Sequence, residues 1–98
     1  MYVNIIHTYR DVIAIADKEL LGKVFEEGDK QLNVKESFYK GEIMSPEETE
    51  KVMEIWKSED ATFNLVGEKT IQLAIEKGLI HEESVKTIQG IPYSLILL

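Results

Sequence analysis

The segment Asn64–Gly78, with the sequence NLVGEKTIQLAIEKG, has the residue types and spacing that most resemble a chemical motif. Its GEKT stretch is similar to the end of a phosphate-binding loop, in which a lysine must follow a glycine directly so that both reach the phosphates. Here Glu68 separates Gly67 from Lys69, and no glycine lies just upstream. A carboxylate in that position would repel a phosphate group, so the sequence does not predict a phosphate-binding loop.

The same segment fits a helix, with Asn64 expected as the N-cap and Gly78 as the residue that ends it. Gly67 is unexpected in such a helix, where glycine costs about 1 kcal/mol relative to alanine. We expect Gly67 to allow the close approach of another backbone or, as the alternative, of a small anion to the first helical turn. Packing against a backbone is the favoured interpretation.

The sequence gives less support to catalytic or metal-binding arrangements of histidine, serine or glutamate. His7 and His81 are the only histidines, and neither has a metal-ligand partner on its own predicted element. No serine lies in a G-x-S-x-G motif. Glu26 and Glu27 are adjacent, so their side chains point apart and do not form an acid/base pair. The sequence therefore predicts no catalytic residue, no metal site and no cofactor.

Composition limits the class of protein. The chain has 98 residues, which suits a single domain over residues 1–98 with one modest core. Its net charge is −7 and its basic residues are scattered, which disfavours generic nucleic-acid binding. It has no cysteine and no apolar run long enough to span a membrane, so we expect a cytoplasmic protein without disulfides.

Hydrophobic patterning predicts strands in the first half of the chain and mostly helices in the second. Alternation predicts strands over residues 2–9 and 30–36, and an apolar run predicts a central strand over residues 12–16. Between them we expect a helical turn, DKELLG, with Asp17 as its cap, and a turn at EEGD. Residues 37–44 are expected to be irregular, with Phe38 facing inward.

Ser45 begins the most clearly marked helix. Pro46 follows it, and Glu48 stands three residues after the cap, which is the pattern of a capping box. The expected buried stripe of this helix is Val52, Met53, Ile55 and Trp56. Further along, a short helix is expected within residues 79–90. The final segment, IPYSLILL, predicts a buried strand, because a proline is tolerated at a strand start.

These elements together predict an α+β fold. A small mixed sheet would form from the N-terminal half plus the C-terminal strand. Two to three helices, including those that begin at Ser45 and Asn64, would cover it.

The segments ELLGKVFEEG, FYKGE, NLVGEKTIQLAIEKGLI and GIP occur in an order that resembles a small archaeal family. That family is known as a domain of unknown function, number four hundred and twenty-four. The resemblance covers almost the whole chain and implies a compact cytoplasmic α+β domain without known activity or cofactor. Family members tend to carry a histidine after the late glycine-hydrophobic-proline motif. Tyr93 stands there in this chain, so a role that rests on that histidine would not transfer.

The resemblance singles out polar residues within these motifs: Lys23, Glu27, Tyr39, Glu42, Asn64 and Glu68. As a functional site with Gly67, some of them would gather at the start of the Asn64 helix, where Lys23 and free N–H groups hold an anion and Glu68 acts as a base. As a structural set, Asn64 caps the helix, Tyr39 packs its ring, and Lys23 and Glu42 cover the rim. The structural interpretation is favoured.

Two functions follow from these alternatives. The first is a non-catalytic binding or assembly module that uses an exposed apolar strand edge or the Trp56 helix to bind a protein partner or a second copy. The second is a small enzyme or ligand-binding protein for an anionic metabolite at the helix start near Asn64. No nucleophile, metal set or cofactor motif supports the second, so the first is preferred.

Overall fold

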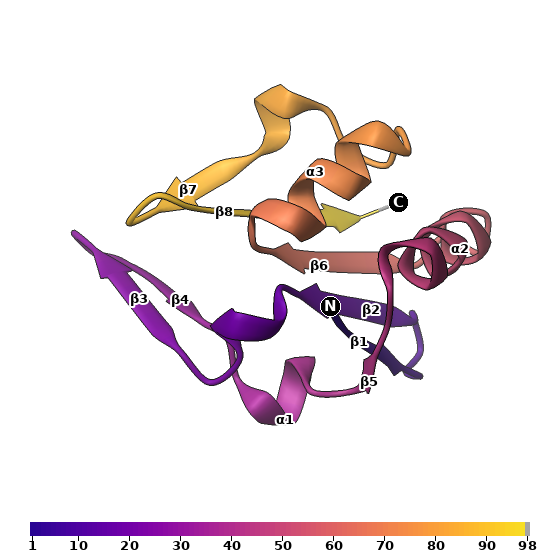
Figure 1. Ribbon diagram of the computed structural model, residues 1–98, viewed down its shortest axis with the longest axis horizontal. Coiled ribbons are helices and arrows are strands. Elements are labelled where there is room, and N and C mark those ends of the chain that lie inside the picture. The colour runs from indigo at the N-terminus through magenta and orange to yellow at the C-terminus, as the bar shows by residue number, and fades with distance from the viewer. Residues whose placement is uncertain (98) are drawn as a thin grey trace.

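The computed structural model describes the backbone of residues 1–97 and the side chains of residues 1–95. Within these residues, one six-stranded mixed sheet, a separate hairpin and three α-helices form the α+β fold that the sequence predicts (Figure 1). In spatial order, the strands of the sheet are β5 (Glu42–Ile43), β1 (Tyr2–Ile6), β2 (Val12–Ala16), β6 (Thr62–Val66), β8 (Ile91–Leu97) and β7 (Lys86–Ile88). The other elements are η1 (Lys18–Leu20), β3 (Val24–Glu27), β4 (Lys30–Asn33), α1 (Glu36–Tyr39), α2 (Pro46–Lys57), α3 (Glu68–Glu76) and η2 (Glu82–Ser84).

Strands β2 and β6 lie in the middle of the sheet, where both of their faces are largely buried. β2 pairs antiparallel with β1 and parallel with β6 in a register that sets Ala16 beside Val66. β8 then pairs antiparallel with the other edge of β6. The expected central strand over residues 12–16 is therefore confirmed.

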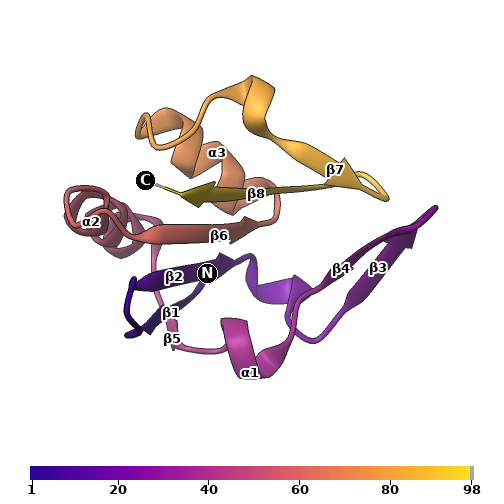
Figure 2. The same ribbon diagram turned by 180° about the vertical axis from the view of Figure 1, so that it is seen from behind.

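The two faces of the sheet have different covers (Figures 1 and 2). α2 and α3 cover one face, where Ile13, Phe63 and Leu65 of the strands join Met53 and Ile71 of the helices in the larger core. η1, α1 and the β3–β4 hairpin lie on the other face. The smaller core there comprises Ala14, Ala16, Leu20, Val34, Tyr39 and Val66.

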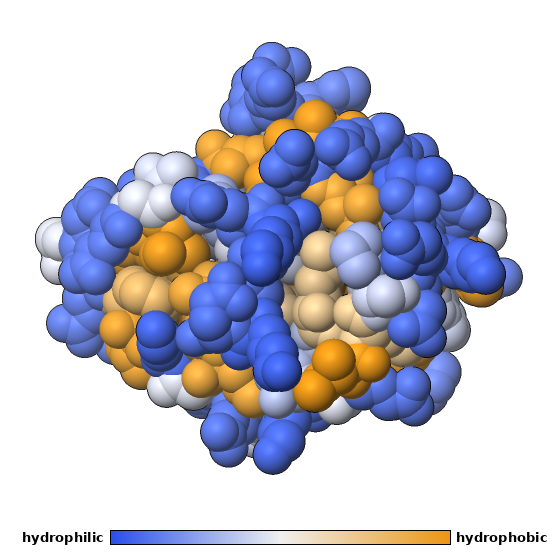
Figure 3. Space-filling view, viewed as in Figure 1, coloured by the Kyte–Doolittle hydropathy of each residue, from blue (hydrophilic) through white to orange (hydrophobic). Residues whose placement is uncertain are grey.

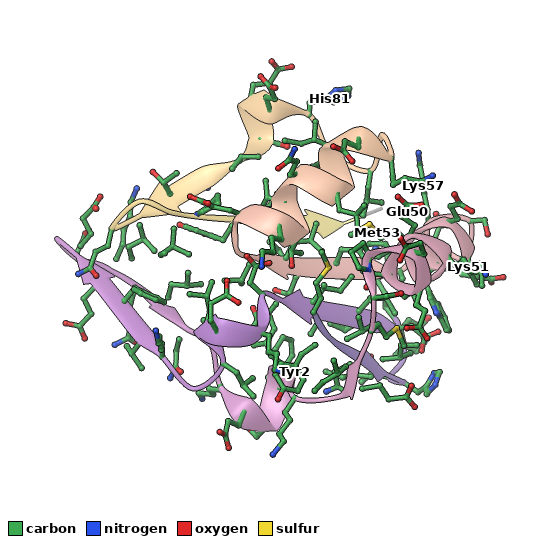
Figure 4. All side chains as sticks on the ribbon, in the orientation of Figure 1. Tyr2, Glu50, Lys51, Met53, Lys57 and His81 are labelled. Atoms are coloured by element: carbon green, nitrogen blue, oxygen red, sulfur yellow. The ribbon has the colours of Figure 1, made fainter. Side chains whose placement is uncertain are left out.

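Helix α2 begins at Pro46 with the predicted capping box in place. Met53 is 1% exposed and points from the helix toward the sheet (Figure 4). The predicted stripe is wrong at Ile55, which is 58% exposed, and Trp56 is only half-buried at the edge of the core. The ring of His7 lies against Trp56, with 5.8 Å between the ring centroids.

Four predictions in the first half need correction. The first strand ends at Ile6 rather than continuing to residue 9, since residues 8–10 form the bend into β2. The turn predicted at EEGD is shorter, because β3 extends through Glu27 and pairs with β4. The strand expected at residues 30–36 ends at Asn33, since α1 begins at Glu36, and it lies in a hairpin outside the main sheet. Residues 37–44 are not irregular: they include most of α1 and all of β5.

The second half contains more strand than the sequence indicated. Asn64 lies in β6 and is not a helix cap, because the run TFNLV, rich in β-branched and aromatic residues, fills the centre of the sheet. The helix expected within residues 79–90 is wrong beyond η2: residues 86–88 form β7. Gln89 and Gly90, with φ of 50° and 77°, make the two-residue turn into β8.

The final strand is confirmed through residue 97, and Leu98 lies outside the described residues. It is not buried throughout, since the side chain of Leu95 is 67% exposed. The turn before β8 also holds the β3–β4 hairpin in place. The Gln89 backbone N–H donates to Glu27 Oε1 (2.8 Å), and the Gln89 side chain donates to the Glu26 carbonyl (2.6 Å).

Candidate functional site

The start of α3 is closed by a side chain from another part of the sequence. Asp17 follows β2 directly and is 3% exposed. Its Oδ2 accepts a hydrogen bond from the Lys69 N–H (3.0 Å), and its Oδ1 accepts from both the N–H and the Oγ1 of Thr70 (2.8 Å each). A helix N-terminus favours a negative charge, and here the protein's own carboxylate supplies it. Asp17 therefore occupies the place predicted for an anion.

Gly67 adopts a conformation that only glycine takes readily, with φ of 109° and ψ of 155°. A Cβ built on Gly67 would lie 2.3 Å from Cγ of Asp17. The close approach predicted for Gly67 is present, but the neighbour is a side chain and not a backbone. Asp17 was expected to cap the helical turn after it, yet η1 has no side-chain cap.

The polar residues predicted as a site are spread over several elements. Lys23 is exposed between η1 and β3, and Asn64 lies in mid-sheet, paired with Ala14 on one side and Leu95 on the other. Glu42 lines a shallow hollow beside β1, whereas Glu68 lines a different groove on α3. Among residues 1–97, no principal hollow is lined by two of these predicted residues.

Tyr39 is the one predicted site residue that lies in a core. It is 6% exposed, and its ring meets that of Phe38 edge-on at 5.0 Å. Burial raises the pKa of the Tyr39 phenol to about 12. Its neutral form packs against the sheet, as the structural interpretation expected.

An open groove of about 540 Å³ lies between α3, η2 and the start of β8. Its apolar lining comprises Ile71, Ile75 and Pro92, and its polar lining comprises Glu68, Gln72, Glu76 and Glu82. Glu68, Gln72 and Glu76 recur every four residues, so they form one ridge of the helix, and Glu82 stands on η2. Figure 3 shows apolar surface between α3 and η2 with hydrophilic residues around it.

The glutamates of this groove have no basic partner among the described residues. The ion pairs lie elsewhere: Lys77 contacts Glu54 at 2.9 Å and Glu50 at 3.8 Å, where α3 meets α2. The hydrogen bond to Glu54 and the charges of both glutamates raise the pKa of Lys77. No lysine or arginine lines the groove. It therefore combines an apolar floor with an acidic rim, and Lys69 lines an adjoining hollow that shares Gln72 and Glu76 with it.

The two histidines do not meet. His7 contacts the Asp11 carboxylate at 3.3 Å, a pairing that the sequence spacing left open, and His81 projects from the start of η2 (Figure 4). Among the residues that the structure describes, no three histidine or acidic side chains are grouped so as to hold a metal ion. No helix there is long and apolar enough to cross a membrane.

Sequence reasoning missed both main features of this region. The role of Asp17 depends on a contact across more than fifty positions of the chain, and no local pattern signals it. The groove could have been found from the Glu68, Gln72 and Glu76 spacing beside Ile71 and Ile75. Assigning a helix start three residues too early placed Asn64 at the site instead.

The fold and the groove define a small α+β domain with a mixed sheet and an open surface groove beside α3. The chain belongs to the family described as protein of unknown function (DUF424), whose model matches residues 6–98. It is also similar to a solved structure, an uncharacterized conserved protein from Methanopyrus kandleri. That likeness has a TM-score of 0.84 at 26% identity and covers 97% of this chain and 88% of the other. Comparison with curated proteins gives no match.

Proposed function

We propose that this chain is a non-catalytic protein-binding module, and that the α3 groove receives a cationic, amphipathic segment of its partner. The observation that carries the proposal is the groove itself, with Ile71 and Ile75 as an apolar floor and unpaired glutamates around it. Apolar contact would supply affinity, while lysine or arginine of the partner would pair with the rim.

The size of the groove fits such a segment. Its volume of about 540 Å³ holds a few side chains, which corresponds to a short stretch of helix or extended peptide. Amphipathic segments bind grooves of this kind through apolar anchors spaced along one face. Ile75 is half-buried and lies four residues after Ile71, which is 4% exposed, so the apolar surface that α3 offers is centred on Ile75.

Charge favours a basic partner. The chain carries a net charge of −7, and the groove adds local negative charge with no lysine or arginine in its own lining. Such a field attracts cationic segments over several ångströms and repels phosphate backbones. Binding should therefore weaken as ionic strength rises.

The filled start of α3 supports a binding role over the alternative, an enzyme for an anionic metabolite. That alternative needs free N–H groups at the helix N-terminus, and those of Lys69 and Thr70 donate to Asp17. The proposal places the module in the cytoplasm, in keeping with a chain that has no cysteine.

The test is affinity capture from an extract of the native host, read out by quantitative mass spectrometry with cross-linking. The double variant Glu76→Gln, Glu82→Gln should retain the partner at least about tenfold less well than the unmodified chain. The cross-linked peptide of the partner should contain lysine or arginine beside an apolar residue.

The matched control is Glu19→Gln, Glu59→Gln, which changes the net charge equally at exposed positions outside the groove. This control should retain the partner. An equal loss of partner retention in both double variants would show that only net charge matters. Full retention by both would show that the partner binds outside the groove. Both results contradict the proposal.

A further inference from the structure

Strand β8 has one edge that pairs over five residues and another that pairs over three. On one side, Tyr93–Leu97 pair with β6. On the other side, only Ile91–Tyr93 pair with β7. Figures 1 and 2 show β7 leaving β8 and rising to η2, so that no strand lies beside the second half of β8.

The chain before β7 cannot extend the ladder because it is folded on itself. The N–H of Ser84 donates to the His81 carbonyl (3.0 Å), and that of Val85 donates to the Glu82 carbonyl (3.1 Å). Only a side chain reaches this part of β8, where the Ser94 hydroxyl donates to the Ser84 carbonyl at 3.4 Å.

The alternation of hydrogen bonds along β8 shows which of its backbone groups have no partner strand. Gly67 donates its N–H to the carbonyl of Pro92, so Pro92 and Ser94 direct their backbone toward β6. Because antiparallel ladders alternate, Leu95 directs its N–H and C=O to the opposite edge, beyond the end of β7. Among the described residues, neither group of Leu95 has a hydrogen-bond partner there.

This edge has none of the usual protection against pairing. Exposed edges are commonly blocked by lysine, proline or a bulge. Pro92 lies in the half that β7 already covers, and no charged side chain occurs from residue 87 to residue 98, although 30% of the chain is charged. The side chain of Leu95 is 67% exposed, and no helix covers that face of β8 in Figure 2.

We propose that the open edge of β8 pairs antiparallel with the same edge of a second copy of this chain, with Leu95 of each copy near the two-fold axis. An antiparallel edge is self-complementary, so one strand can serve as its own partner. Two chains of net charge −7 repel one another, and this uncharged stretch is where they can approach without opposing acidic side chains. The two six-stranded sheets would become continuous.

Sedimentation velocity on the full chain tests the pairing over about 1 μM to about 1 mM, the range expected for a small interface. The unmodified chain should convert from monomer to dimer within it. Leu95→Lys sets two charges beside the axis and should raise the dimer Kd at least tenfold. Leu95→Pro removes the outward N–H and leaves the ladder to β6 intact, so it should have the same effect.

Val24→Lys is the matched control, because Val24 is 50% exposed on β3 and the charge change is equal. It should dimerise like the unmodified chain. Circular dichroism of each variant checks that it is folded, and Leu95→Lys alone decides the test if Leu95→Pro unfolds. A monomer throughout the range overturns the proposal, as does a dimer that Leu95→Lys leaves unchanged. The groove variants Glu76→Gln, Glu82→Gln should dimerise normally, so this result is independent of the proposed function.

Discussion

Helices α2 and α3 cover the same face of the sheet, but their N-termini are closed in opposite ways. At α2, Ser45 Oγ accepts from the Glu48 N–H (3.1 Å), and Glu48 Oε1 accepts from the Ser45 N–H (3.0 Å). Those groups are three residues apart and exposed. At α3, Gly67 has no side chain to offer, and Asp17 caps the helix from a buried position more than fifty residues away.

The difference shows how a helix start can depend on a sheet. β2 and β6 are parallel and in register, with Ala16 beside Val66. The next residues along, Asp17 and Gly67, are therefore side by side, and the Asp17 N–H donates to the Val66 carbonyl (3.0 Å). The residue that follows β2 therefore caps α3, the helix that follows the neighbouring strand β6. The α2 cap can form before the sheet does, whereas the α3 cap cannot.

Gly67→Ala should produce the largest effect. It strains a glycine-only conformation and drives Asp17 out of its place, so we expect a loss of about 4 kcal/mol in the free energy of unfolding by urea. Gly78→Ala is the control, because Gly78 also has positive φ but nothing lies within 4 Å of its added Cβ. It should cost about 1 kcal/mol. Equal losses in the two variants would show that Asp17 does not restrict Gly67.

Asp17→Ala should come next, at about 3 kcal/mol, because it leaves the buried N–H and hydroxyl of Thr70 and the part-buried N–H of Lys69 without their acceptor. The double variant Asp17→Ala, Gly67→Ala tests whether the two residues are energetically coupled. Since the added methyl clashes with Asp17, the double variant should lose less than the sum of the two single losses. Strict additivity in urea unfolding would show that the two residues are not coupled.

Ser45→Ala should cost less, about 1 kcal/mol, the usual effect of removing an exposed cap. The same urea unfolding experiment measures it. A loss as large as that of Asp17→Ala would contradict the comparison, because the local cap of α2 would then stabilise the protein as much as the distant cap of α3.

Glu48 should give the smallest effect, visible as a pH dependence. Its hydrogen bonds with the Ser45 backbone and side chain lower the pKa of Glu48 below its ordinary value of 4.5. A lowered folded-state pKa gives stability that is present above pH 4.5 and is lost as the pH falls through the folded-state value. Between pH 6 and pH 3, the Glu48→Gln variant should lose less stability than the unmodified chain. Identical pH profiles would show that the capping box carries no titrating charge.

Local signals in the sequence located several elements correctly. The proline and glutamate after Ser45 marked α2, the apolar run marked β2, and the last apolar segment marked β8. One error falls where a strand passes into a helix without a loop. β6 passes into α3 at Gly67 alone, and the strand residues of β6 also fit the helical period, so the sequence predicts a cap at Asn64.

The candidate site was less predictable than the fold. Gly67 was recognised as unusual, because its helix propensity conflicts with its position, but the residue beside it could not be named. The other predicted polar residues were chosen by motif, and the structure distributes them among α1, β5, β6, α3 and the connection before β3. Helical spacing correctly predicted that Ile71 and Ile75 lie on an apolar face, and Ile71 is 4% exposed in the larger core. The spacing does not show that this face also borders a groove, because that depends on which elements lie beside α3.

By itself, the sequence determined the α+β class, the capped start of α2, the strand nature of residues 12–16 and 91–97, and the strongly negative charge. Each follows from residues close together in the chain or from composition. Tertiary structure alone decided that Asp17 closes α3, that an acidic groove opens beside it, and that β8 outreaches β7. Those features depend on which strands become neighbours and in what register, and that choice is set by burying both faces of β2 and β6 together.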